Sequence, residues 1–199
     1  MSEKSRCSWA ENTLLYLDYH DTEWGRPLHD DRRLFEMLLL EGAQAGLSWI
    51  TVLKKREAYR EAFDGFDPHQ IALYGDTKIQ ELMANEGIVR NRLKINAAIT
   101  NAKLFLEVVD KHGSFDTFIW KYVDYKPITG RWKKIEDIPA TTPLSDKISG
   151  ELKKMGFKFV GSTIIYSFMQ AVGMVNDHIT ECFVYKEMLK EQPAAPLSA

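Results

Sequence analysis

The 199-residue sequence contains only two cysteines and no long apolar run. Two cysteines are too few for a disulfide scaffold, and apolar stretches as short as Met37 to Leu40 cannot span a bilayer. The charged residues near the start are followed by no apolar core, so we expect no secretory signal. A composition of 45% hydrophobic and 27% charged residues also excludes collagen-like repeats and overall disorder. We therefore expect a globular cytoplasmic protein with no membrane partner.

The chain also lacks a strong net charge of either sign. Its formal net charge is -2 and its pI is near 6.2, below the value above about 9 that is typical of a strongly basic nucleic-acid binder. Positive charge is nevertheless concentrated locally. Residues 87–103 and 126–134 contain no acidic residue, and Lys153, Lys154 and Lys158 flank Met155. A basic face on an acidic body is compatible with a polyanionic partner, and equally with a solvated helix face.

No long segment alternates with period two, and capping residues with helical apolar spacing occur almost throughout. We expect an all-α fold with a single domain at residues 1–190 and a disordered Pro/Ala tail at 191–199. The helices are expected at residues 31–45 after an aspartate cap, from Ser48 to Phe63, from Pro68, at 77–87, from Asn91 to Val109, from Ser114, at 145–155, at 161–172 and at 177–189.

Each of the two cysteines has a histidine near it in the sequence: Cys7 with His20, and Cys182 with His178. If residues 177–189 are helical, His178 and Cys182 share one face. A Cys2His2 set suits tetrahedral zinc and leaves no position for water, so we expect one structural Zn2+ per chain that joins the two ends. Two other interpretations remain open: buried thiols beside unrelated histidines, and a Cys7–Cys182 disulfide, which a reducing cytosol disfavours.

The middle of the chain contains an amphipathic helix up to Gly87, a short apolar hairpin and a second helix from about Asn91. Exposed amides of such a hairpin and of a helix N-terminus attract phosphate. The pattern, at about residues 77–106, is similar to the helix–hairpin–helix element that holds a DNA backbone without reading sequence. An ordinary αα-hairpin with a basic surface is the alternative, because Val89 occupies a position where many such hairpins have a second glycine. The candidate DNA-backbone contacts are Gly87, Ile88, Val89, Arg90, Arg92 and Lys94.

A group of aromatic residues and one carboxylate lies near the start of the chain. Tyr16, Tyr19 and Trp24 precede a segment that runs from Glu41 to Trp49, and Tyr16 and Tyr19 share a face if their segment is helical. Glu41 falls on an otherwise apolar helix line, where an unpaired carboxylate is costly unless it faces a cleft. Flat rings around a lone carboxylate suit a pocket for a flat, cationic heterocycle. The alternative is an aromatic core with one surface glutamate.

These segments together carry a resemblance to a known family. The residues concerned are 16–25, 40–56, 87–95, 156–170, 176–178 and Cys182. They closely resemble the DNA-3-methyladenine glycosylase I (Tag) family, over about residues 7–185. The resemblance implies a two-lobed, all-α fold of the helix–hairpin–helix glycosylase type. It also implies a structural zinc held by Cys7, His20, His178 and Cys182, and a base pocket formed by Tyr16, Tyr19, Trp24, Glu41 and Trp49.

The resemblance further implies a monomeric enzyme that hydrolyses the N-glycosidic bond of 3-methyladenine in double-stranded alkylated DNA. The free base and an abasic site would be the products. A methyl group at N3 makes the base cationic and a good leaving group, so the enzyme need not protonate it. Glu41 is the expected catalytic residue, and no lysine motif suggests a lyase step. The alternatives are a non-enzymatic DNA-backbone binder and a zinc hydrolase for a small molecule; the absence of an open metal position disfavours the hydrolase.

Overall fold

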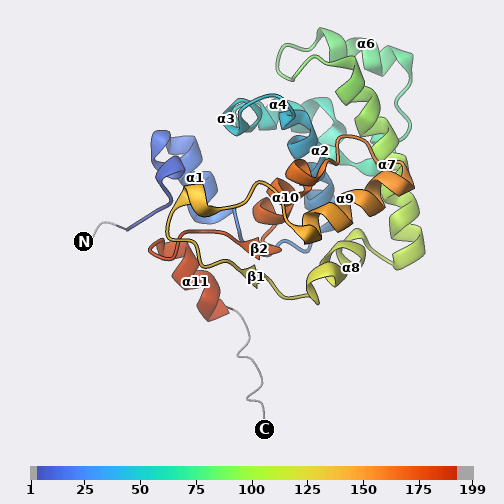
Figure 1. The fold of residues 1–199 in the computed structure, drawn as a ribbon. Coiled ribbons are helices and arrows are strands. Elements are labelled where there is room, and N and C mark those ends of the chain that lie inside the picture. Colours follow the sequence, from blue (N-terminus) through green and yellow to red (C-terminus); the bar gives the residue numbers. More distant parts are fainter. Residues whose placement is uncertain (1–3, 192–199) are drawn as a thin grey trace.

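The computed structural model describes residues 4–191. Of the tail expected at 191–199, Glu191 ends the last helix and residues 192–199 lie outside the described range. Helices account for most of the described chain (Figure 1). The α-helices are α1 (Leu14–Thr22), α2 (Asp31–Gln44), α3 (Trp49–Leu53), α4 (Arg56–Ala62), α5 (Pro68–Ile71), α6 (Asp76–Ala84), α7 (Arg92–His112), α8 (Phe115–Trp120), α9 (Pro143–Met155), α10 (Ser162–Ala171) and α11 (Phe183–Glu191). Short 3-10 helices are Ser8–Asn12, Asp64–Phe66, Lys121–Val123 and Ile135–Asp137.

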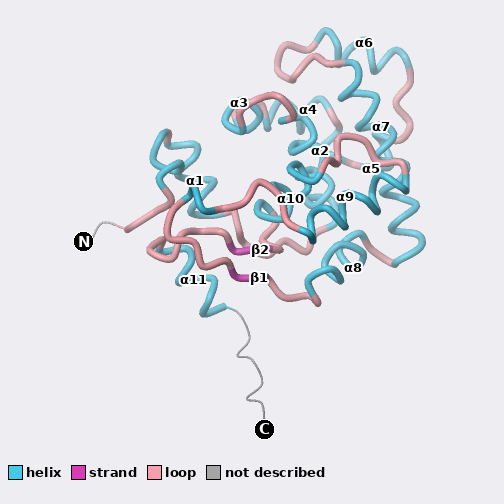
Figure 2. Tube along the Cα trace, viewed as in Figure 1, coloured by secondary structure: helices cyan, strands magenta, loops and turns pink. Residues whose placement is uncertain are grey.

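The expected helical character is confirmed, with one small exception. Strands β1 (Ile128–Thr129) and β2 (Val175–Asn176) form a parallel pair, drawn in magenta in Figure 2. Ile128 lies opposite Val175, and Thr129 lies opposite Asn176. Two residues per strand are too few to show a period-two pattern, so this pair could not be found by looking for alternation.

The expected helix starts are confirmed where a short polar side chain caps the first turn. Asp30 accepts a hydrogen bond from the Arg33 amide, Asn91 from that of Lys94, and Ser114 from that of Thr117. Three expected helices differ from the structure, and the one expected at residues 177–189 begins only at Phe183. The segment from Ser48 to Phe63 is divided into α3 and α4, and α6 ends at Ala84 rather than at residue 87.

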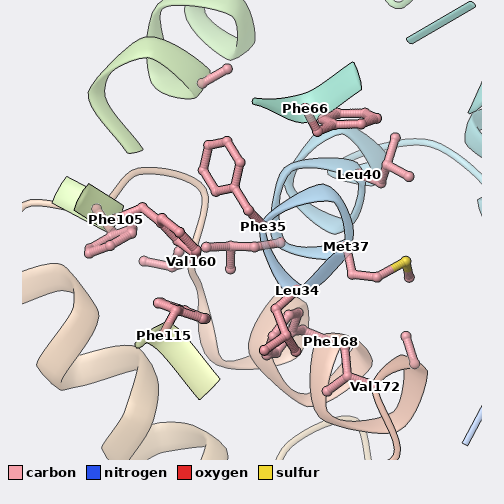
Figure 3. Packing of buried hydrophobic residues seen from close by; sticks show 14 of the residues in the cluster. Leu34, Phe35, Met37, Leu40, Phe66, Phe105, Phe115, Val160, Phe168 and Val172 are labelled. Atoms are coloured by element: carbon pink, nitrogen blue, oxygen red, sulfur yellow. The ribbon is translucent and has the colours of Figure 1, made fainter. Parts of the chain in front are cut away.

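Helix α2 is the centre of the hydrophobic core. Figure 3 shows its side chains pointing in several directions, with Leu34 toward Phe168, Phe35 toward Phe105 and Leu40 toward Phe66. These residues are almost fully buried. From Leu34 onward α2 has no exposed residue, so this part of the helix offers no solvated face for charged side chains. The two glutamates of α2 therefore need special surroundings, and one of them lies at the candidate site.

The two ends of the described chain meet on one side of the molecule, where α1 and α11 lie (Figure 1). The Phe183 amide donates a 2.9 Å hydrogen bond to the Ser5 carbonyl. Cys7, Cys182, Val184, Tyr185 and Met188 form a hydrophobic cluster there, separate from the main core. Among residues 4–191, no helix combines the length and apolar character needed to cross a membrane.

Candidate functional site

A hollow of about 520 Å³, open to solvent, lies between α1, α2, α3 and α10. All five residues expected to form a base pocket line it. Four further residues, which the sequence analysis did not select, complete the wall. The lining residues are Trp9, Tyr16, Tyr19, Trp24, Glu41, Gln44, Trp49, Ser167 and Gln170. The structure thus brings together segments that are more than 150 positions apart in the sequence.

The aromatic wall is held by ring contacts between neighbouring elements. Trp9 packs edge-on against Tyr16, with ring centroids 5.4 Å apart, and against Trp24 at 5.1 Å. Tyr19 and Trp49 have centroids 5.6 Å apart. Helix α1 places Tyr16 and Tyr19 on one side, and the Thr13 side chain caps this helix by accepting from the Tyr16 amide. The wall therefore presents flat, rigid surfaces to the hollow.

Three buried polar atoms of the lining residues have no hydrogen-bond partner within residues 4–191. They are the Tyr19 hydroxyl, the Glu41 Oε2 and the Trp49 Nε1. Leaving such a group unpaired costs about 1–3 kcal/mol, and most buried polar atoms in proteins are paired. Three unpaired atoms around one hollow indicate a site for a ligand that has both donors and acceptors.

Glu41 has a protonation state that differs from the sequence expectation. Burial raises the pKa of its carboxyl to about 8, because the low-dielectric surroundings disfavour the charged form. At neutral pH, with no ligand in the hollow, the group is therefore mostly a neutral acid, whereas the sequence analysis treated it as a carboxylate. A cation that entered the hollow would favour ionisation of Glu41. Burial is also the main cause of the raised pKa of Tyr19.

Trp9, Gln44, Ser167 and Gln170 were not among the expected site residues. Ser167 and Gln170 are three positions apart on α10, so they share the face that lines the hollow. The Ser–x–x–Gln spacing within an otherwise apolar helix was the signal that could have identified them. Trp9 could have been found from its position two residues after Cys7, beside the expected metal ligand.

The expected metal ligands also lie close together. The ligand atoms of Cys7, His20 and Cys182 are all within 4.8 Å of one another and buried. Cys182 Sγ is 3.5 Å from His20 Nε2, and hydrogen bonding from Cys7 lowers the pKa of the Cys182 thiol. His178 is the fourth candidate; its ring centroid is 4.9 Å from that of His20, and its buried Nε2 has no partner among the described residues.

The tautomers of both histidines can be inferred from their neighbours. His20 Nδ1 lies 2.8 Å from an Asp21 carboxylate oxygen, and His178 Nδ1 lies 3.1 Å from the Asn176 Oδ1. Since both oxygens only accept, each Nδ1 carries the hydrogen, which leaves both Nε2 lone pairs free to bind a metal. An outer hydrogen bond of this kind is usual for metal-binding histidines. The donor set and its surroundings therefore fit a tetrahedral zinc ion.

The expected placement of His178 and Cys182 on one helix is wrong. Helix α11 begins at Phe183, so both residues precede it. The chain leaves the extended β2 strand at Asn176, whose side-chain oxygen faces the His178 ring. This extended strand and the turn after it replace the expected helical start at residue 177. Both residues therefore lie in the loop between β2 and α11, and no helical periodicity relates them.

Residues 85–91, here termed the hairpin segment, join α6 to α7. Gly87 is required by close packing, because an added Cβ would be only 2.8 Å from the Ala58 Cβ. Its amide donates to the Asn85 side chain at 2.8 Å, and the Val89 amide donates to the Tyr59 hydroxyl at 3.1 Å. Both of these amides, which we expected to face phosphate, are therefore engaged within the fold.

Three amides around the start of α7 are free instead. Within residues 4–191, the amides of Arg90, Arg92 and Leu93 have no hydrogen-bond acceptor. The side chain of Arg92 is exposed, and Arg90 lies 3.5 Å from the exposed Glu86 carboxylate. Helix α7 has 21 residues, so its N-terminus also carries the positive end of a long helix dipole. The free amides of this region lie at residues 90–93, whereas the amides of Gly87 and Val89 are paired.

Lys94 has a different environment from the two arginines. Its Nζ donates to the carbonyls of Ala43, at 2.8 Å, and Ala45, at 2.7 Å. Burial lowers the pKa of this ammonium group. Lys94 thus holds the C-terminal end of α2, directly beyond Glu41, and it links α7 to the wall of the hollow. The contacts of Lys94 within residues 4–191 are thus with protein carbonyls, unlike those of the exposed Arg90 and Arg92.

The chain has clear similarity to known proteins. The methyladenine glycosylase family matches residues 9–185. DNA-3-methyladenine glycosylase 1 of Escherichia coli K12 is 49% identical over 180 residues, which are 90% of this chain and 96% of that protein. A crystal structure of 3-methyladenine DNA glycosylase I superposes with a TM-score of 0.87 at 53% identity, covering 90% of this chain and 98% of that one. A structure of the Staphylococcus aureus enzyme, described as showing the basis of 3-methyladenine recognition, has a TM-score of 0.87 at 38% identity over 89% of this chain and 95% of that one. The chain belongs to the methyladenine glycosylase family.

Proposed function

We propose that this protein is a monofunctional DNA glycosylase that releases 3-methyladenine from alkylated double-stranded DNA. The observation that carries the proposal is the aromatic hollow with its three unpaired buried polar atoms. Its flat walls and polar edges suit a purine base. Two relatives that are 49% and 47% identical to this chain are named as DNA-3-methyladenine glycosylases. The base would enter the hollow after rotation out of the duplex, which costs a few kcal/mol and less for a weakly stacked lesion.

The proposed chemistry depends on charge. A methyl group on N3 makes adenine in DNA cationic, so the base is a good leaving group without a proton from the enzyme. The cation favours the ionised form of Glu41, whose proton then passes to solvent. Water attacks the sugar carbon as the N-glycosidic bond breaks and releases a proton to solvent, while the bonding electrons leave with the base, which becomes neutral. The cationic base is attracted to the Glu41 carboxylate, and this Coulomb attraction strengthens as water is excluded. Normal adenine is neutral and lacks this attraction.

The direct test is release of free base from methylated duplex DNA. The wild-type protein should release 3-methyladenine and leave abasic sites, without cutting the strand. Binding to the duplex with no release of base would contradict the proposal and support the non-enzymatic binder instead. A small-molecule zinc hydrolase would show neither duplex binding nor base release.

For the DNA contact, we propose that a phosphate binds at the start of α7, at the amides of residues 90–93, with Arg90 and Arg92 adding charge. Each phosphate contact contributes a slope of about one to the salt dependence of binding. Arg92→Glu should lower duplex affinity for all sequences alike and reduce the slope by about one. Lys186→Glu on α11 makes the same charge change away from the hairpin segment and should leave the slope as it is. If the salt dependence of duplex binding has the same slope in both variants, the proposed phosphate contact at the start of α7 is contradicted.

For the two ends of the chain, we propose one structural zinc ion held by Cys7, His20, His178 and Cys182. The ion would stabilise residues 1–190 as a single domain by joining the ends, since metal binding contributes to folding free energy. Protein purified without chelator should contain close to one zinc per chain. Cys182→Ser should lower the melting temperature more than it lowers base release by the folded fraction. Metal analysis that finds no zinc would contradict this assignment.

A further inference from the structure

Asp177 is a buried carboxylate beside the candidate site that the proposed chemistry does not use. Its residue is 2% exposed. One oxygen, Oδ2, accepts from the Tyr166 hydroxyl at 2.5 Å and from the Gln170 Nε2 at 2.9 Å. The other oxygen accepts from the Trp132 Nε1 at 2.7 Å. Burying a carboxylate is costly, and three neutral donors satisfy this one, two from α10 and one from the segment after β1.

The surrounding backbone is shaped to hold this carboxylate in place. Gly130, directly after β1, donates its amide to the Asn176 carbonyl at 3.0 Å. A Cβ at Gly130 would lie 2.7 Å from the Asp177 Oδ1 and 2.3 Å from the Trp132 Nε1, so no other residue fits there without a shift. The pairing of β1 with β2 thus sets the position of Asp177, which immediately follows β2.

The consequence for Gln170 is a fixed orientation of its amide group. A carboxylate can only accept hydrogen bonds, so the Gln170 nitrogen must face Asp177, as the structure shows. The Oε1 is then on the other side of the amide. Gln170 lines the hollow, and its oxygen has no hydrogen-bond partner among the described residues. The wall therefore carries an acceptor whose direction is set from behind by Asp177.

We propose that Gln170 is a specificity-determining residue, which accepts a hydrogen bond from the 6-amino group of the flipped base and rejects a base with oxygen at that position. The inference rests on the proposed glycosylase function. Adenine carries an amine donor at position 6, whereas guanine carries a carbonyl acceptor. Glu41 can change its protonation state, so it can accept from an amine or donate to a carbonyl, whereas the Gln170 amide held by Asp177 presents only an acceptor. Asp177 is the positioning residue that keeps the Gln170 amide from turning.

The test compares the two methylated purines in one substrate. Duplex DNA methylated at both adenine and guanine N3 is incubated with wild-type protein and with Gln170→Leu, which keeps the bulk and removes the acceptor. A site built to bond a polar group discriminates strongly against an analogue that cannot pair with it. The variant should raise the release of 3-methylguanine relative to 3-methyladenine about tenfold, chiefly by slowing 3-methyladenine release.

Tyr166→Phe is the matched control, because it removes another donor to Asp177 and leaves Gln170 in place. It should lower stability and keep the wild-type ratio of the two released bases. If Gln170→Leu slows the release of both bases equally, the inference on Gln170 is overturned and the glycosylase proposal stands. An equal slowing is what general damage to the fold, as in Tyr166→Phe, would produce. A wild-type protein that releases neither base contradicts the glycosylase proposal itself, so the two failures are distinguishable.

Discussion

Helix α2 carries two buried glutamates, five positions apart, in opposite electrostatic situations. The Glu36 side chain is 7% exposed and lies 2.5 Å from the Arg56 Nε and 2.8 Å from the Arg60 NH2. Arg56 in turn forms a two-pronged contact with Glu23 at 2.7 and 2.8 Å. Glu41 is equally buried but is one of the unpaired polar groups of the hollow. The same helix thus buries one charge that the fold has neutralised and one acid that the fold has left for a ligand.

The presence of a cationic partner at Glu36 and its absence at Glu41 distinguish a stabilising group from a functional one without any appeal to conservation. A buried ion pair contributes to folding only through its partner, and removing one partner is strongly destabilising. A buried acid without a cation weakens the folded state at neutral pH, so its retention needs another reason. Glu36 and its arginines hold α2 against α4, whereas Glu41 is available for a cation in the hollow. Each prediction below changes one side of this comparison.

The largest effect is expected from Arg56→Met. The substitution leaves Glu36 and Glu23 without their main partner and should lower the free energy of unfolding by about 3–5 kcal/mol. Urea unfolding followed by circular dichroism measures the change. Arg33→Met is the matched control, since the Arg33 side chain is 53% exposed and lies 3.9 Å from Glu23. A small, equal loss for both variants would contradict the stabilising role of the buried network.

Glu41→Gln should have the opposite effect on stability, and the effect should depend on pH. The folded-state pKa of about 8 lies above the ordinary value of 4.5, so wild-type stability is fully present below about pH 4.5 and is lost as pH rises to about 8. Glutamine does not titrate. The variant should therefore be more stable than wild type by on the order of 3 kcal/mol at pH 7, and by less than about 1 kcal/mol at pH 5. Parallel stability curves across this range would contradict the unpaired state of Glu41.

The same substitution should reduce base excision. Glutamine keeps the shape of Glu41 but cannot ionise when a cationic base enters, and hydrogen bonds to charged groups contribute roughly 1.5–3 kcal/mol. We expect a loss of about ten- to hundredfold in single-turnover excision, with affinity for undamaged duplex close to wild type. Excision that is unchanged in a folded variant would leave recognition to the aromatic wall alone.

The smallest effect is expected from Lys94→Met. It leaves two carbonyls at the end of α2 without a donor and should cost about 1–2 kcal/mol of stability. Because Lys94 is engaged with α2, the salt dependence of duplex binding should stay at the wild-type slope. If the slope of the salt dependence falls by one unit, as expected for Arg92→Glu, Lys94 does contact a DNA phosphate and this prediction is wrong.

The sequence was most informative where a residue conflicted with its local pattern. Glu41 on an apolar helix line and two cysteines with neighbouring histidines were visible as anomalies, and both lie where the structure places a candidate site. The helices with polar caps, such as α2 and α7, were also predicted correctly. Helical periodicity and capping are local properties, so a single sequence carries them.

Features that depend on distant partners could not be predicted. The protonation state of Glu41 depends on the absence of a nearby cation, and the engagement of the Val89 amide depends on Tyr59, 30 residues earlier. Gln170 lines the hollow, and the partner of its amide nitrogen is Asp177, which lies beyond the end of α10 and after β2. His178 lies in a loop because β2, which pairs with β1, ends just before it. Each of these strands has two residues, which is too short to show a period-two alternation of apolar and polar residues.

The central claim is that Glu41 is buried without a partner while Glu36 is neutralised, and a titration of the Glu41 side-chain carboxyl carbon by NMR tests it most directly. The resonance is identified by its absence in Glu41→Gln. In the ligand-free protein it should titrate with a pKa of about 8. A midpoint near the ordinary value of 4.5 would show a solvated or paired carboxylate and would contradict the account.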